Sequence, residues 1–121
     1  MLRRTLLALI PLAILALAPI ASASPELRGA AARGDTEAVK RFIAAKAPLD
    51  AQDERGQTAL LLAVAAGHTA AAIALIDAGA SVNVQAANQD TPWLLAGASG
   101  RAAILERMLT AKPDLRIRNR F

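Results

Sequence analysis

Residues 53–83 read DERGQTALLLAVAAGHTAAAIALIDAGASVN, and this stretch contains the signals for two short helices joined by a tight reversal. Thr58 can cap the first helix by accepting hydrogen bonds from its unpaired backbone N–H groups. Gly67 supplies the reversal, and Gly79 ends the second helix in the left-handed conformation that glycine tolerates. The stretch therefore predicts a helix pair that follows a turn at residues 53–57.

The same pattern recurs along the chain at a spacing of 33 residues. Glycine recurs at the reversal, while apolar residues recur at matching places in both helices. Neither helix of a unit can bury its apolar face alone, so stacked units must bury it between them, and about three units are the minimum for this. The columns are Gly34, Gly67 and Gly100; Leu27, Leu60 and Trp93; Ala30, Ala63 and Ala96; Phe42, Leu75 and Met108; Ile43, Ile76 and Leu109; and Leu49, Val82 and Leu115.

The middle unit resembles the ankyrin repeat family. Its segments DERGQTAL (53–60), Gly67-His68 and LIDAGASVN (75–83) are similar to the family's D-x-x-G-x-T-P-L, A-A-x-x-G-H and L-L-x-x-G-A-D-V-N. The resemblance covers Ser24 to Arg120 and implies an all-α ankyrin-repeat solenoid of about three helix-turn-helix units with projecting β-turns. The units span about 24–52, 53–85 and 86–118.

The first and third units depart from this pattern. The third has Gln89 in place of the turn glycine, and the first lacks the turn and begins at Ser24-Pro25, a pair that can cap its first helix. Lys46 and Lys112 occupy the column of the helix-ending glycine, where a side chain in the left-handed conformation costs roughly 1 kcal/mol relative to glycine. We therefore expect these two units to be less stable than the middle one.

Residues 1–23 have the three parts of a secretory signal peptide. Two arginines precede an uncharged apolar run, and Ala21-Ser22-Ala23 supplies the small residues that a signal peptidase needs. A membrane-spanning helix needs about 18 consecutive apolar residues, and Pro11 interrupts this run well below that length. We expect cleavage after Ala23, which leaves residues 24–121 as the ankyrin repeat domain in the periplasm or outside the cell, with membrane contact only during export.

Composition argues against nucleic-acid and metal binding. The chain has a formal net charge of +4, and removing the two arginines of residues 1–23 leaves 12 basic and 10 acidic residues, or +2. The basic run Arg116, Arg118 and Arg120 has no aromatic residues interleaved, whereas a nucleic-acid surface would need a broad basic patch with stacking groups. With no cysteine and one histidine, the chain has no metal-ligand spacing.

The sequence contains no catalytic constellation. His68 stands at the helix reversal, where the resemblance implies a structural role, and no histidine is placed to activate Ser81 or Ser99. Four acids lie near the turns, where no pocket is expected to separate a carboxylate pair for acid–base work. We therefore expect no catalytic residue, cofactor or small-molecule substrate. These acids are Asp50, Asp53, Glu54 and Asp90.

The resemblance implies a protein-binding surface along the concave face, which the turn tips and the first helices form. The side chains there are polar and of both signs, which favours a protein partner with complementary charges. Trp93 shares a core column with Leu27 and Leu60, so we expect it to be buried; the alternative is a partly exposed binding anchor. The candidate partner-binding residues are Arg33, Glu54, Arg55, Gln57, Ala65, Asn88, Asp90 and Ser99.

Two functions stay open at this point. The first is an exported interaction module for a periplasmic or secreted client, and the second is a membrane-associated structural protein held by an uncleaved N-terminal anchor.

The stretch Asp90-Thr91-Pro92-Trp93 resembles exported bacterial ankyrin proteins, which tend to carry further repeats. In the last helix, expected at about 102–111, the residues Ile104, Leu105, Met108 and Leu109 cover a wide part of the circumference.

The breadth of this apolar surface predicts an array that is incomplete at its carboxyl end, since a finished array ends in a repeat with a polar outer face. Two explanations compete. The sequence is either a truncated product or fragment, or a short protein that covers this end by forming a dimer.

Overall fold

The structure is a computed structural model that describes residues 25–113. Within this range the chain forms six helices and no strand, which confirms the predicted all-α array of helix pairs. The expectations about the signal segment, the Ser24 cap and the run from Arg116 to Arg120 concern residues outside this range. The helices are α2 (Pro25–Arg33), α3 (Thr36–Ala44), α4 (Ala59–Ala66), α5 (Thr69–Asp77), α6 (Pro92–Ala98) and α7 (Ala102–Leu109).

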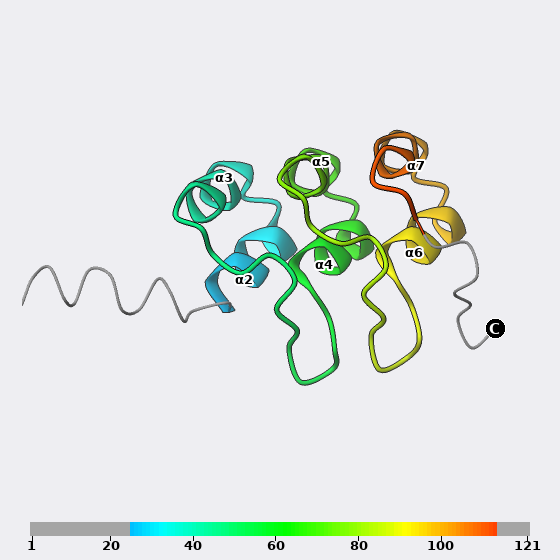
Figure 1. Ribbon diagram of the computed structural model, residues 1–121, viewed down its shortest axis with the longest axis horizontal. Helices are drawn as coiled ribbons and strands as arrows, with labels where there is room; N and C mark the ends of the chain where they lie inside the picture. The colour runs from blue at the N-terminus through cyan, green and yellow to red at the C-terminus, as the bar shows by residue number, and fades with distance from the viewer. Residues whose placement is uncertain (1–24, 114–121) are drawn as a thin grey trace, which may run out of the picture.

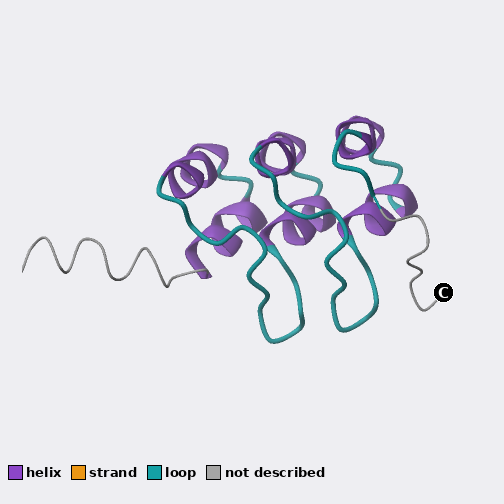
Figure 2. Cartoon of the chain, in the orientation of Figure 1, coloured by secondary structure: helices purple, strands orange, loops and turns teal. Residues whose placement is uncertain are grey.

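The six helices lie in two rows. Helices α2, α4 and α6 form the first row and α3, α5 and α7 form the second, so that each unit contributes one helix to each row (Figure 1). Each helix contacts its partner in the same unit and the equivalent helix of the adjacent unit. The loops that precede α4 and α6 project from the first row in the same direction (Figure 2). The stack is therefore quasi-one-dimensional, with each unit supported by its neighbours.

Threonine caps start the first-row helices of the second and third units, as the sequence predicts. The Oγ1 atom of Thr58 accepts from the N–H of Leu61 at 3.2 Å, and that of Thr91 accepts from Leu94 at 3.1 Å. Both threonines are buried, so their hydroxyl groups need these partners. The proline after Thr91 is the first residue of α6, where its missing N–H leaves no bond unmade.

The predicted left-handed residues are also confirmed. Gly79 has φ = 100° after α5, and Lys46 and Lys112 adopt φ = 63° and 53° in the same column. In the turns, Gly56 has φ = 74° and Gln89 has φ = 71°. Lys46, Gln89 and Lys112 therefore each accept a strained backbone conformation that glycine would adopt freely, a cost of roughly 1 kcal/mol each.

The core lies between the units and consists of a few large apolar side chains among many alanines. Leu75 is fully buried and Ile76 is 5% exposed, so both belong to the core of the middle unit. Ala30, Ala63 and Ala96 are fully buried along the first row, where their small side chains allow adjacent helices to approach closely. The fold thus combines large buried side chains with the close helix contacts that the alanines allow.

Apolar side chains are more exposed to solvent in the third unit. Trp93 packs against the core but is only half-buried, unlike the leucines of its column, so the structure supports a core contact and leaves part of the ring accessible. In α7, Ile104 and Met108 are fully buried, Leu105 is half-buried and Leu109 is 61% exposed. The expected helix at 102–111 ends at 109. Truncation and dimer formation stay predictions.

We predict that Leu75→Ala lowers the free energy of unfolding by about 2–5 kcal/mol, because it leaves a cavity between units in addition to removing buried methyl groups. The same substitution at the exposed Leu109 is the matched control and should cost about 0.5 kcal/mol or less. Urea unfolding measures both values. A cost for Leu75→Ala no larger than that of the control would contradict the packing described above.

Candidate functional site

The two projecting loops, the first turn (52–57) and the second turn (85–90), are built by the same backbone bonds. In the first turn the N–H of Asp53 donates to the carbonyl of Gln57 at 3.0 Å, and the N–H of Gly56 donates to the carbonyl of Asp53 at 2.9 Å. The equivalent bonds recur in the second turn at 2.8 and 2.9 Å. A left-handed residue follows each tip, as in three-residue hairpin loops built on a type I turn.

Polar side chains within the turns hold them in shape. The Oδ1 atom of Asp53 accepts from the N–H groups of Arg55 at 2.9 Å and Gln57 at 2.8 Å. In the second turn Asn88 takes this role, because its Oδ1 accepts from the N–H of Asp90 at 3.1 Å and its Nδ2 donates to the Asp90 carboxylate at 2.8 Å. Two candidate partner-binding residues, Asn88 and Asp90, therefore also have a structural role.

The two turns are bonded to each other as well. The N–H of Ala87 donates to the carbonyl of Arg55 at 2.9 Å. The Nε2 atom of Gln52 bridges the turns, since it donates to the carbonyl of Gly56 at 2.9 Å and to that of Gln85 at 3.2 Å. A Cβ atom added at Gly56 would lie 3.1 Å from backbone atoms of the second turn. The turns therefore form one connected surface with fixed spacing.

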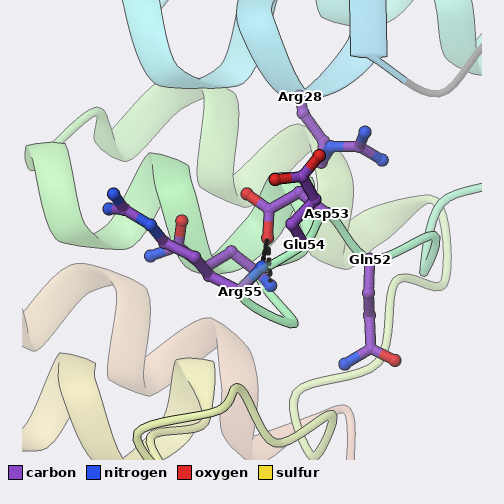
Figure 3. Close-up of a pocket in the computed structure, with 6 residues that line it drawn as sticks. Arg28, Gln52, Asp53, Glu54 and Arg55 are labelled. Carbon is purple, nitrogen blue, oxygen red and sulfur yellow. Dashed lines mark hydrogen bonds between the residues drawn. The ribbon is translucent and has the colours of Figure 1, made fainter.

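A pocket of about 600 Å³ lies between α2 and the first turn. Arg28 extends from α2 toward this turn, as Figure 3 shows, and its Nη1 atom makes a long hydrogen bond of 3.5 Å to the carbonyl of Ala51. The pocket brings together three of the candidate residues and three that sequence reasoning missed. The lining residues are Glu54, Arg55 and Gln57, which were predicted, and Arg28, Gln52 and Asp53, which were not.

Arg28 could have been found from its column. The equivalent residues of the other units are Leu61 and Leu94, so an arginine here is a charge in an otherwise apolar column. Leu61 is buried and Leu94 is half-buried, whereas Arg28 lies at the edge of the pocket. A break in a repeat column was therefore a usable signal for a site residue.

The remaining candidates lie at the ends of the first-row helices. Arg33 is the last residue of α2, Ala65 lies in the last turn of α4, and Ser99 immediately follows α6; all three are exposed. They are accessible to a partner, but they line no part of the pocket beside the first turn. Their role in binding stays a prediction.

Two of the polar residues considered for catalysis, His68 and Asp50, have structural partners in the adjacent unit. The Nε2 atom of His68 lies 3.1 Å from the carbonyl oxygen of Ala32, and a Cβ atom added at Gly34 would come within 2.5 Å of its ring. The N–H of Ser81 donates to the Asp50 carboxylate at 2.8 Å, which links the first unit to the second. His68 and Asp50 thus join adjacent units.

Arg101 repeats the arrangement of His68 one unit later. It stands in the same column, and its guanidinium covers Gly67, where an added Cβ atom would lie 2.9 Å from Nη2. The side chain after each of these reversals therefore packs on the reversal glycine of the preceding unit.

Over residues 25–113, no group of three or more His, Cys, Asp or Glu residues could hold a metal ion. No helix in the same range is long and apolar enough to cross a membrane.

Comparisons with known proteins agree with this geometry. A family model for ankyrin repeats in three copies matches residues 27–119. The crystal structure of EF0377, an ankyrin repeat protein, is 40% identical with a TM-score of 0.78, over 82% of this chain and 51% of that one. An ankyrin repeat domain from Acinetobacter baumannii AYE is 43% identical with a TM-score of 0.75, over 78% and 48%. The chain thus spans about half the length of these structures. No curated protein matches it significantly.

We predict that Gly34→Ala destabilises the protein more than Gly100→Ala does. Both glycines have positive φ, at 73° and 66°, so both variants incur the left-handed penalty of roughly 1 kcal/mol. A Cβ atom at Gly34 also meets the His68 ring, whereas one at Gly100 has nothing within 4 Å. Displacing a packed ring should add about 1–3 kcal/mol, measured by thermal or urea unfolding. Equal costs for the two variants would mean that His68 does not couple the first and second units.

Proposed function

The chain belongs to the ankyrin repeat family, and on that premise we propose that it is an exported interaction module that binds a protein client. Ankyrin repeats generally mediate protein–protein interaction, and proteins built from them are typically not enzymes. The proposed binding face comprises the first turn, the second turn and the exposed ends of α2, α4 and α6. The family supplies the class of function, and the side chains on this face must supply the specificity.

The observation that carries this proposal is that some polar side chains of the first turn hold its backbone in place, while others make no bond to the described residues. Asp53 and Gln52 are committed to backbone groups that hold the turn. The side chains of Glu54 and Arg55 make no hydrogen bond or ion pair to any residue within 25–113, although the turn fixes their backbone. Charged groups of both signs are therefore presented on a rigid support, which lowers the entropy lost when a partner binds.

Export and location in the periplasm or outside the cell are part of this proposal. Their support is the signal pattern of residues 1–23, with its basic start, interrupted apolar run and small residues before Ser24. A bacterial source is supported by the similarity to the Acinetobacter baumannii domain. The client is then a protein that meets this chain after export.

We predict that the charge swap Glu54→Lys with Arg55→Glu weakens client binding by about tenfold or more. The swap reverses two charges that form no ion pair with the described residues, and it preserves the net charge. Clients are captured from the exported fraction on the unmodified chain, and their affinities for the variant are then measured. The melting temperature should change little, since neither side chain supports the fold.

The matched control is Glu37→Lys with Lys40→Glu on α3 in the second row. These two residues form an exposed pair at 3.9 Å, so this swap also preserves net charge and leaves an opposite-charge pair. Client binding should survive it. If the control swap abolishes binding and the turn swap does not, the binding face has been placed on the wrong side of the molecule.

We predict that the protein isolated from the exported fraction begins at Ser24. Amino-terminal sequencing or intact mass distinguishes this form from the full chain of 121 residues. Recovery of the intact N-terminus in the membrane fraction would instead support a membrane-anchored structural protein and would contradict the export proposal.

A further inference from the structure

The row of turns has an unpaired backbone edge. Between the two turns, the N–H of Ala87 is bonded to the carbonyl of Arg55. The residue one period before Ala87 is Glu54, and its N–H has no hydrogen-bond partner among residues 25–113. Because both turns are built by the same internal bonds, this N–H is directed to the side of the first turn that faces away from the second. The carbonyl of Gln52 likewise accepts no bond from the described residues.

The pocket beside the first turn lies on this same side. It is an open depression lined by Arg28 of α2 and by the first turn itself, and no described turn precedes α2 (Figure 1). In the repeat register, the columns of a preceding turn fall on residues 19–24. Cleavage after Ala23 would remove all but the last of them. The pocket is thus the place that a preceding turn would fill, and this step rests on the proposed export.

We propose that the open side of the first turn is a docking edge for an extended segment of the client. A backbone carbonyl of this segment accepts from the Glu54 N–H, as the Arg55 carbonyl accepts from Ala87 in the adjacent pair of turns. Unpaired backbone edges commonly bind extended peptides in this way, with main-chain bonds supplying affinity and side-chain contacts supplying specificity. This inference deepens the proposed function by naming what the client presents.

The segment should carry a carboxylate opposite Arg28. Among residues 25–113 the Arg28 guanidinium has only its long bond to the Ala51 carbonyl and no carboxylate within ion-pair distance. Asp53 and Glu54 line the same pocket and offset the charges of Arg28 and Arg55, so the pocket has no excess positive charge to favour a segment with several negative charges. The chemistry therefore favours an extended peptide with a single acidic side chain.

Glu54→Pro tests the backbone bond when it is compared with Glu54→Ala, because both variants lack the Glu54 carboxylate and only the proline lacks the N–H. Glu54 is the second residue of a turn that the Gly56 N–H closes onto the Asp53 carbonyl, a position that proline favours. Relative to Glu54→Ala, the proline removes only the unpaired N–H, and it should leave the unfolding midpoint unchanged. Ala87→Pro is the matched variant in the same column, and it should lower the midpoint because its N–H is bonded to Arg55. Equal effects of the two variants on the midpoint would overturn the assignment of the open edge.

The binding probe is a displayed library of short linear peptides, selected against the purified protein. Relative to Glu54→Ala, Glu54→Pro should lower the affinity of the selected peptides about three- to tenfold, which corresponds to the loss of one hydrogen bond. Arg28→Leu, which restores the residue of its column, should lower it by a similar factor. The control swap of Glu37 and Lys40 should have no effect. Failure to select peptides, or equal affinities of Glu54→Pro and Glu54→Ala, would overturn the docking edge.

Amide hydrogen exchange in the free protein provides a second test. The Glu54 N–H should exchange rapidly and the Ala87 N–H slowly, because only the latter is bonded. Protection of Glu54 in the free protein would place the chain's own preceding residues on this edge and overturn the proposal.

The experiments distinguish a failure of the docking edge from a failure of the proposed binding face. If the turn charge swap weakens client capture while Glu54→Pro binds the client as well as Glu54→Ala does, the binding face is supported and the docking edge is ruled out.

Discussion

Contact between adjacent units is the interaction on which the rest of this structure depends. Each helix has only seven to nine residues, a length at which an isolated helix is marginal in water. Burial of one unit against the next supplies the missing stability, and the alanines of the first row allow the close approach that this burial needs. Ion pairs add little to the stability of the fold. The pair of Arg107 and Asp77, at 2.9 Å, is half-exposed on both sides, so it contributes about 1 kcal/mol or less.

The same stacking sets the geometry of the turns. Because α4 and α6 pack side by side, the loops that precede them are brought close enough for direct bonds between the turns, through Ala87 and through the side chain of Gln52. Backbone bonds and the Asp53 carboxylate then fix each tip. The stack thus separates two groups of polar residues: those that hold the turns, and those, such as Glu54, that are held by them and stay accessible.

One irregularity of the array, Arg28, coincides with its candidate binding features. The middle unit has glycine at the turn tip, at the reversal and at the end of its second helix. Arg28, by contrast, lies in the first unit, where no described turn covers it, and its column is leucine elsewhere. Within a repeat protein, a column that breaks its pattern without a structural reason is informative, because stacking tends to favour the same residue type in every unit.

The sequence by itself determined the helix pairs, the threonine caps and the left-handed positions of Gly79 and Lys46. These features are local or strictly periodic, so spacing and residue type are enough to specify them. Only the tertiary structure decided that Arg28 joins the first turn in a pocket, that Asn88 and Asp90 bond each other, and that Trp93 stays half-buried. Those outcomes depend on the distance and orientation between neighbouring units, which the packing of side chains across the interface sets and which a one-dimensional pattern does not contain.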